Sequence, residues 1–341
     1  MRAALFEGPR AIRVCSVPDP VPGVDEVTVR VRRCGICGTD SHIWQGLFPV
    51  GELPRILGHE FSGEVAAIGP GVSGYEEGDR VVADINMGCG HCVYCHRGQH
   101  LRCDGLRQIG IHVDGAFAEF VRVPAQALRR IPAGMSFEAA AVTEPLACAL
   151  HGQDQVDIQP GEVVVVLGGG PMGLLHCMVS TLRGAACVIA CDPNEFRRDF
   201  SLRVGADCAV AGDADLIRDV VLDRTAGQGA DVVIEAVGSA PTYATAMTLV
   251  RPGGRVLFFG AAAPHDEISL HPFDVYRREL TLVGSYAGSY GSWDQAIALL
   301  SAGRIPATEL VTSVRPLEEL GESIEAIATR PDAIKIQIAV A

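Results

Sequence analysis

The sequence is poor in charged residues and contains no segment of low complexity. Only 20% of its 341 residues are charged, and the net charge at pH 7 is −13. Such a chain lacks the basic face that phosphate binding needs, which excludes nucleic acid as an expected partner. Long apolar runs are also missing: the run at 163–167 ends in glycines and is too short to span a bilayer. We therefore expect no membrane partner.

No segment resembles a signal peptide, because Met1 leads directly into an alternating run at 2–6. We therefore expect a cytoplasmic protein. The length of the chain and its 48% content of hydrophobic residues suffice for two domains of ordinary size.

The pattern of apolar residues changes near Glu144. Before this residue, short strands punctuated by proline and glycine predict a compact β unit, with strands at 26–31, 61–68 and 80–83. After it, short apolar strands alternate with helical segments, which is typical of a doubly wound parallel sheet. The fold class is therefore α/β.

The second region is expected to contain six strands and at least two helices between them. The strands are predicted at 162–167, 186–191, 208–210, 231–236, 255–259 and 280–283. The helices are predicted at 171–182 and 195–204. An amphipathic helix at 293–301 and a short strand at 333–340 follow.

A glycine motif, G-x-G-x-x-G, follows the first of these strands and opens a helix. Gly168 allows a tight turn, Gly170 lets a pyrophosphate approach the backbone, and Gly173 lets the helix lie close to the strand. The N–H groups of the first helical turn are available to phosphates. We take Leu174, the next residue of the helix, as a further candidate for cofactor binding.

Asp192 ends the second strand, nineteen residues after Gly173. A carboxylate at this point accepts the ribose hydroxyls of NAD and repels the 2′-phosphate of NADP. Arg197, five residues further on, could instead receive that phosphate. We expect NAD, because the carboxylate lies at the tip of the strand. The structural alternative is an α/β domain with a glycine-rich turn and no cofactor.

Twelve cysteines are present, and their arrangement indicates metal binding rather than disulfides. Four of them lie within fifteen residues: Cys89, Cys92, Cys95 and Cys103. Tight clustering in a chain without an export signal favours thiolates on a metal. Four sulfur ligands close a tetrahedral shell, so this loop predicts a structural zinc site. The histidines of the loop are expected to be solvated: His91, His96 and His100.

A second, dispersed set of ligands comprises Cys37, His59, Glu60 and Glu144. One sulfur, one imidazole and one carboxylate make a mixed shell, which is typical of a catalytic zinc with a position open for water or substrate. By spacing alone the set is only suggestive, because a histidine beside a glutamate is more often a surface or core residue.

Four motifs in the same order resemble those of the medium-chain, zinc-containing alcohol dehydrogenase family. They are Cys37-Gly38-Thr39-Asp40-x-His42, the G-H-E-x-x-G…G-x-G-V motif that starts at Gly58, the four-cysteine loop and the glycine motif. The resemblance covers essentially the whole chain. It implies a catalytic, chaperonin-10-like β-domain at 1–148 with both zinc sites, an NAD-binding Rossmann domain at 149–285, and a segment at 286–341 that returns to the catalytic domain.

Within that family the chain is most similar to the polyol (sorbitol) and threonine dehydrogenases, because Glu144 stands where ethanol dehydrogenases have a cysteine ligand. The resemblance implies that Cys37 and His59 bind the catalytic zinc. Glu60 and Glu144 compete for the remaining position, one of them through water. Thr39 and His42 match a relay that carries the alcohol proton to solvent, while hydride passes to NAD. The catalytic candidates are therefore Thr39, His42 and Glu144.

One stretch departs from the sorbitol-type pattern. Those members have an arginine shortly after the last Rossmann strand, whereas this chain reads Gly-Ser-Tyr-Ala-Gly-Ser-Tyr at 284–290. The departure argues against sorbitol and threonine as substrates and leaves a cyclitol, an amino-cyclitol or another sugar-derived alcohol, within the wider class of small polyols and amino-alcohols. We expect NAD, two zinc ions per chain, a small alcohol or ketone as substrate, and a homodimer or homotetramer.

Two other functions remain as alternatives. The first is an NADPH-linked ketone or aldehyde reductase, which Arg197 favours and Asp192 opposes. The second is a non-catalytic NAD(H)-binding protein on the same fold. The complete set of catalytic candidates and zinc ligands argues against the second alternative, because a protein without turnover would not need it.

Overall fold

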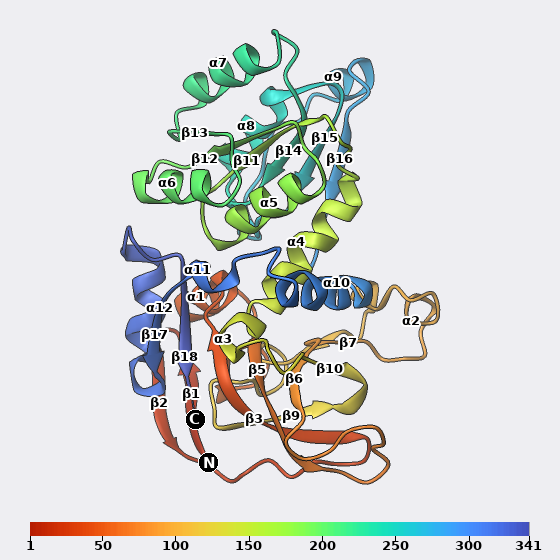
Figure 1. The fold of residues 1–341 in the computed structure, drawn as a ribbon, viewed down its shortest axis with the longest axis vertical. Helices are drawn as coiled ribbons and strands as arrows, with labels where there is room; N and C mark the ends of the chain where they lie inside the picture. The colour runs from red at the N-terminus through yellow and green to blue at the C-terminus, as the bar shows by residue number, and fades with distance from the viewer. Residues whose placement is uncertain (341) are drawn as a thin grey trace. The chain divides into compact units, whose positions relative to one another are not determined.

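The structure is a computed structural model that describes residues 1–340 of the chain (Figure 1). It divides into two compact units. The first unit comprises residues 1–147 together with the chain from residue 287 onward, and the second comprises Cys148–Tyr286. Helix α4 (Thr143–Val156) begins in the first unit and ends in the second.

The first unit is built mainly on a seven-stranded sheet in the described chain, with the order β10-β6-β5-β3-β18-β17 and with β9 paired to β3. Its strands are β3 (Glu26–Gly35), β5 (Glu60–Ile68), β6 (Arg80–Ala83), β9 (Phe120–Pro124), β10 (Leu128–Arg130), β17 (Val311–Pro316) and β18 (Lys335–Ala339). Because β17 and β18 come from the C-terminal segment, this sheet joins both ends of the chain.

Smaller elements complete the first unit. The remaining strands are β1 (Arg2–Gly8), β2 (Ala11–Ser16), β4 (Arg55–Ile56), β7 (Asn86–Met87) and β8 (Arg107–Gln108). The α-helices are α1 (Gly38–Gln45), α2 (Val93–His96), α3 (Phe137–Ala140), α10 (Tyr290–Ser301), α11 (Ala307–Leu310) and α12 (Leu320–Thr329). The 3-10 turns are η1 (His100–Arg102), η2 (Ala125–Ala127) and η3 (Leu317–Glu319).

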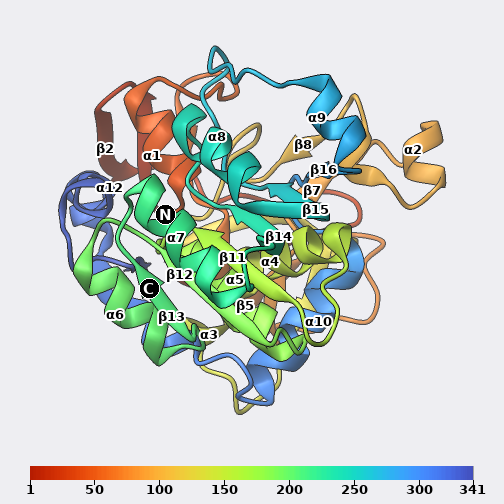
Figure 2. The ribbon, with the colours of Figure 1, turned by 90° about the horizontal axis from the view of Figure 1, so that it is seen from above.

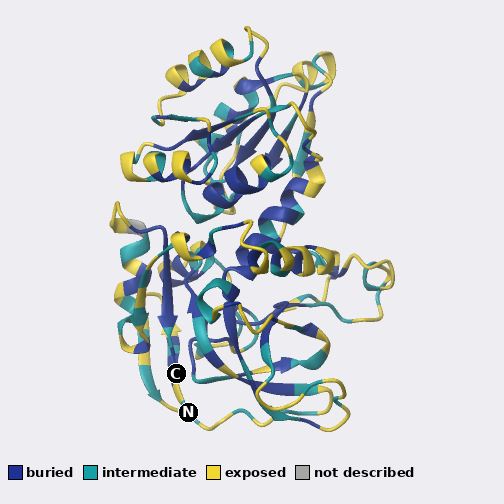
Figure 3. Ribbon diagram, viewed as in Figure 1, coloured by how far each residue is buried: buried dark blue, intermediate teal, exposed yellow. Residues whose placement is uncertain are grey.

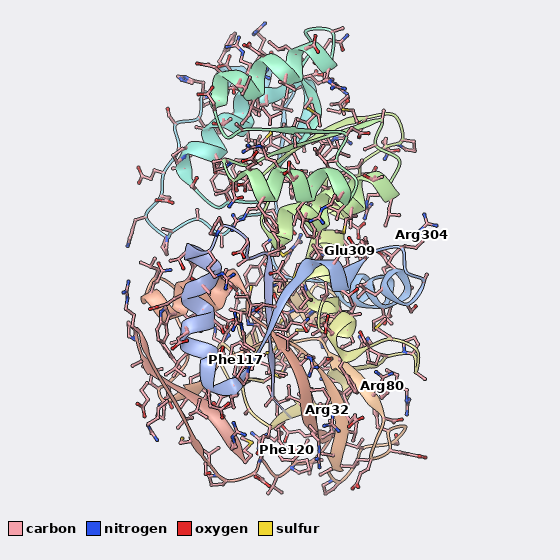
Figure 4. All side chains as sticks on the ribbon, turned by 60° about the vertical axis from the view of Figure 1, so that its left-hand side comes forward. Arg32, Arg80, Phe117, Phe120, Arg304 and Glu309 are labelled. Carbon is pink, nitrogen blue, oxygen red and sulfur yellow. The ribbon has the colours of Figure 1, made fainter. Side chains whose placement is uncertain are left out.

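Alternating residues of β3 form the centre of this unit's core. Val27, Val29 and Val31 are fully buried, as is Phe117 in the segment before β9. Arginines lie where the strands reach the surface: Arg32 pairs with Glu64 at 2.7 Å, and Arg80 lies over an aromatic ring (Figure 4). The alternation of apolar and polar residues thus places one face of each strand inside.

The second unit is a six-stranded parallel sheet, within the described residues, in the order β13-β12-β11-β14-β15-β16. Its strands are β11 (Val163–Leu167), β12 (Cys187–Cys191), β13 (Cys208–Val210), β14 (Ala230–Glu235), β15 (Val250–Phe258) and β16 (Thr281–Gly284). Its helices are α5 (Pro171–Leu182), α6 (Glu195–Arg203), α7 (Ala214–Arg224), α8 (Ala240–Leu249) and α9 (Pro272–Arg277).

Helices cover both faces of this parallel sheet, with α5 and α6 on one side and α7 and α8 on the other (Figures 1 and 2). The strands are therefore buried on both faces, and Figure 3 shows their central parts as buried. This explains why β11 is a continuous run of valines rather than an alternating strand.

The predicted α/β fold class and the order of strands and helices are confirmed. The main differences are that β15 begins five residues before its predicted start, and that α1 was not predicted as a helix. No helix in the described part of the chain is long and apolar enough to cross a membrane.

Candidate active site and metal centres

The mixed set of ligands begins where β3 ends and α1 starts. Cys37 is the N-cap of α1, and its backbone N–H donates to Asp40 Oδ2 at 2.9 Å. The other oxygen of the same carboxylate, Oδ1, lies 3.7 Å from Nδ1 of His59. Asp40 thus accepts a hydrogen bond from the backbone of Cys37 and lies within ion-pair distance of His59. A carboxylate behind a histidine ligand is a common way to fix the ring and its tautomer.

The charges around His59 are strongly coupled. Burial alone lowers the pKa of His59, but the negative charges of Asp40 and Cys37 outweigh burial and raise it well above its ordinary value. Burial in turn raises the pKa of Asp40. The raised pKa of His59 thus reflects the acidic groups gathered around a buried imidazole.

The structure brings together three of the four predicted ligands of the mixed set. Single ligand atoms of Cys37, His59 and Glu60 all lie within 4.8 Å of one another. Glu144, near the start of α4, is not a member of this group. It is buried and close enough that its charge raises the pKa of His59. A soft sulfur, an imidazole and a carboxylate in this arrangement fit a divalent zinc ion.

The sequence analysis missed Lys335 of β18. Its Nζ donates to both carboxylate oxygens of Glu60, at 2.7 and 2.8 Å, and to the carbonyl oxygen of Ile36 at 3.1 Å. Burial alone would lower the pKa of Lys335, but the charges of Glu60 and Cys37 raise it. A signal was available, because Lys335 is the single lysine in a sequence with 28 lysine and arginine residues.

The two candidates for the proton relay lie on α1. Thr39 and His42 are both partly exposed and are three residues apart. Residues at this spacing lie on the same face of a helix, one turn apart. The helix that is capped by Cys37 therefore carries both relay candidates.

The four cysteines of the loop also come together. Their sulfur atoms lie within 4.8 Å of one another, and two of them accept backbone N–H groups: Cys103 from Cys89, and Cys92 from Cys95, each at 3.4 Å. The backbone N–H of His91 helps to lower the pKa of Cys89 to about 6. Four sulfurs with backbone donors fit a closed zinc site.

The prediction that all three loop histidines are solvated was wrong for His100. His91 and His96 are exposed, whereas His100 is buried. Its ring stacks on Tyr290 of α10, with the ring centres 3.7 Å apart and the planes at 14°. Its Nε2 lies 3.8 Å from Oδ2 of Asp84. The loop is thereby packed against a helix from the distant C-terminal segment.

The glycine motif of the second unit has the geometry of a phosphate loop. Gly168 has φ +101°, and a Cβ on Gly173 would lie 1.7 Å from the carbonyl oxygen of Gly168. Gly170 is the N-cap of α5, and a Cβ there would meet nothing within 4 Å. Leu174 is fully buried, and its N–H donates to the carbonyl of Gly170. The space beside Gly170 at the start of α5 is thus open, whereas the side chain of Leu174 is buried.

The carboxylate of Asp192 is held by this loop. Its Oδ2 accepts the N–H of Gly169 at 2.7 Å, and its Oδ1 accepts the N–H of Asn194 at 2.8 Å. Nη1 of Arg197 lies 3.8 Å from Oδ2. The structure therefore places the predicted acidic residue and the arginine next to each other at the tip of β12.

Comparisons with known proteins agree with this geometry. Residues 23–133 match the family described as alcohol dehydrogenase GroES-like domain, and residues 171–302 match the family described as zinc-binding dehydrogenase. The chain is 36% identical to sorbitol dehydrogenase of Halalkalibacterium halodurans, over 94% of this chain and 93% of that protein. It is 37% identical to D-altritol 5-dehydrogenase of Agrobacterium fabrum, over 99% and 96% of the two chains.

A solved structure from Sinorhizobium meliloti 1021, described as a zinc-binding dehydrogenase bound to NADP, has a TM-score of 0.92 and 35% identity. The match covers 99% of this chain and 98% of that one. The chain therefore belongs to the zinc-containing alcohol dehydrogenase family, in its polyol dehydrogenase-like group, as its motifs predicted. It is an enzyme, a zinc-dependent oxidoreductase.

Proposed function

We propose that the protein oxidises a secondary hydroxyl of a small polyol or sugar-derived alcohol, with NAD as hydride acceptor. The observation that carries this proposal is the group formed by Cys37, His59 and Glu60, whose ligand atoms lie within 4.8 Å of one another. Polyol and sugar-acid dehydrogenases among the relatives support the substrate class. A bound zinc would supply Lewis acidity that favours loss of the alcohol proton.

The residues around the mixed site have distinct proposed roles. Cys37 and His59 would hold the zinc, with a carboxylate of Glu60 or Glu144 as the remaining protein ligand. Thr39 would accept the alcohol proton through its hydroxyl, and His42 would pass that proton to solvent. An imidazole suits this role because it exchanges protons near neutral pH.

We propose a second, structural zinc on the loop of Cys89, Cys92, Cys95 and Cys103. The close approach of the four sulfur atoms and the backbone N–H groups that donate to Cys92 and Cys103 support it. Reduced thiolates in this loop also support the cytoplasmic location. The expected metal content of the purified protein is therefore two zinc ions per chain.

NAD rather than NADP is proposed from Asp192. Its buried carboxylate lies at the tip of β12, where it would accept ribose hydroxyls and repel a 2′-phosphate. Gly168, Gly170 and Gly173 would let the pyrophosphate approach the start of α5. The second candidate, an NADP-linked reductase, is favoured by Arg197 beside Asp192 and by the relative that is bound to NADP.

The choice of cofactor is tested by kcat/KM for NAD and NADP with the same alcohol. The wild-type enzyme is expected to prefer NAD. Asp192→Ala should narrow the preference by roughly tenfold or more, because a hydrogen-bonding and repulsive carboxylate is lost. Arg197→Ala is the matched control and should lower kcat/KM for NADP more than kcat/KM for NAD. A wild-type preference for NADP would contradict the proposal.

The substrate class is tested with a panel of polyols, cyclitols, amino-alcohols and L-threonine, followed by NADH absorbance. Turnover on polyols or cyclitols supports the proposal, whereas turnover confined to threonine or to primary alcohols contradicts it. We also propose a homodimer or homotetramer, because β16 is a sheet edge and α9, which precedes it in the chain, exposes Phe273 and Tyr276. A monomer by light scattering would contradict the oligomer.

A further inference from the structure

The single lysine of the sequence is buried against a carboxylate of the proposed zinc site. The other 27 of the 28 basic residues are arginines. Lys335 is 4% exposed and Glu60 is 1% exposed, so water screens neither charge. Nζ of Lys335 gives two of its three N–H groups to Glu60 and one to the carbonyl of Ile36.

The backbone fixes where this pair lies. Strand β18 pairs with β3 through Gln337 and Gly35, and the N–H of Ile36 donates to the carbonyl of Ile336 at 2.9 Å. Gly35 also pairs with Glu60 on β5. A Cβ at Gly35 would lie 2.2 Å from Oε2 of Glu60, so only glycine leaves room for the carboxylate in this position.

Glu60 therefore faces two cation sites at once. One is the ammonium of Lys335, which both of its oxygens already contact. The other is the group with Cys37 and His59, whose ligand atoms lie within 4.8 Å of a Glu60 oxygen. A metal on a Glu60 oxygen withdraws electron density from the carboxylate and places a second cation near the ammonium, and both effects weaken the bond to the lysine.

The chemical difference between lysine and arginine indicates that the contact of Glu60 with the basic residue is the one that breaks more easily. A guanidinium holds a carboxylate with two parallel bonds in a fixed plane, whereas an ammonium is a point charge with rotatable donors. All the other basic residues of the chain are arginines. The one lysine holds a carboxylate that lies beside a candidate metal site, where easy release of the carboxylate would be useful.

We propose that Lys335 is a positioning residue that competes with the catalytic zinc for Glu60. This inference rests on the proposed function, because it requires a zinc on Cys37 and His59. By holding Glu60, Lys335 weakens the carboxylate as a zinc ligand and keeps a coordination position available to the alcohol. Glu60 then moves between lysine and zinc, and Glu144 is available as a second carboxylate.

The first test uses the fact that the protein contains one lysine. Lysine labelled with ¹³C at Cε gives a single side-chain NMR signal, which reports on Lys335 without assignment. Zinc added to the metal-free wild-type protein should shift this signal. In Cys37→Ser, which keeps the four-cysteine loop, zinc should leave the signal in place. An unmoved signal in a wild-type protein that has bound two zinc ions would overturn the inference.

The second test uses competition with a chelator to measure the affinity of the mixed-site zinc, which is identified as the zinc that Cys37→Ser lacks. Lys335→Met frees Glu60 and should increase the affinity for this zinc roughly tenfold, whereas loss of a residue that merely orients a metal ligand lowers metal affinity roughly 10–100-fold. In Lys335→Arg, the guanidinium should hold the carboxylate with two parallel hydrogen bonds and lower the affinity for zinc. In the Glu60→Gln background, Lys335→Met should have no effect, because no carboxylate remains to be released.

Kinetics separate positioning from a purely structural role. Lys335→Met should lower kcat while the affinity for zinc rises. In a site that is merely destabilised, both kcat and the affinity for zinc would fall. If Lys335→Met does not fold, Lys335→Arg and the NMR titration of the wild-type protein still decide the matter. A wild-type protein with only one zinc would refute the proposed function. If every Lys335 variant bound two zinc ions with the same affinities as the wild-type protein, this inference would be refuted and the proposed function would stand.

Discussion

The two groups of candidate metal ligands in the first unit are built in opposite ways. The loop from Cys89 to Cys103 supplies four ligands of one kind within one short stretch of chain. The mixed site gathers different side chains from the start of α1, from β5 and from β18, with Glu144 nearby. The comparison shows that a site with identical local ligands can be closed, whereas a site assembled by the fold can leave a position open.

The two groups also handle charge differently. The loop cysteines are mostly partly exposed, and two of their sulfur atoms accept backbone N–H groups. The mixed site is buried and balances its acidic groups with Lys335 and with the imidazole of His59. Buried charges need partners because burial removes the stabilisation by water. Removal of a single side chain is therefore expected to have different consequences in the four-cysteine loop and in the mixed site.

The largest expected effect is on turnover. Cys37→Ser should lower kcat/KM by at least about 10³-fold, because the metal would supply several kcal/mol of transition-state stabilisation. The protein should still fold, bind NADH and retain one zinc. Zinc content, circular dichroism and NADH fluorescence measure these outcomes. Cys15→Ser, on β2, is the control and should change none of them.

The reciprocal change in the loop should affect stability instead. Cys95→Ser should release one zinc and lower the free energy of unfolding by several kcal/mol, because structural zinc contributes directly to folding. The melting temperature should fall by roughly 2–4 °C for each kcal/mol. If Cys95→Ser abolished turnover in a fully stable protein, the assignment of roles to the two sites would be reversed.

A smaller effect is expected from the relay, which only the mixed site should need. His42→Ala should slow alcohol oxidation roughly 10²-fold at neutral pH, the low end for acid–base groups, because water partly substitutes. The defect should shrink at high pH, where hydroxide accepts the proton. The pH profile of kcat measures this, with Thr39→Val as companion variant. An unchanged profile would remove His42 from the mechanism.

The smallest expected effect concerns the contact between the loop and α10. Tyr290→Leu removes the stacking on His100, and an aromatic pair contributes about 0.5–1.5 kcal/mol beyond its buried area. The loop zinc should therefore be lost to a chelator a few-fold faster, with kcat unchanged. Tyr276→Leu is the control, because that side chain is exposed in the second unit. Equal rates in both variants would show that the stack does not secure the loop.

The sequence predicted those parts of the protein that depend on neighbours along the chain. The cysteine spacing, the glycine motif and the valine-rich β11 are local patterns, and the structure has them as expected. The parts that were missed depend on pairing between distant segments. The contact of Lys335 with Glu60 follows from the register of β18 on β3, and the burial of His100 follows from Tyr290. No local pattern encodes either pairing.

Helix α1 was missed for a related reason. Its glycine start and polar residues make it a weak helix by propensity, and it is fixed by its cap and by burial of Ile43 and Trp44. The role of Asp40 is likewise invisible in sequence, because it depends on the distance to His59.

The separation of Lys335 and Glu60 has a consequence for the order of events during synthesis. The two residues lie 275 positions apart. At the usual 5–20 residues per second, the ribosome makes the lysine about 14 to 55 s after the glutamate, whereas the loop cysteines follow one another within about 1 to 3 s. During that interval the carboxylate has no ammonium to hold it, although the loop cysteines are all made well before the interval ends. The contacts of Glu60 are therefore complete only after β18 has joined the sheet, whereas all four loop cysteines are present once residue 103 has been made.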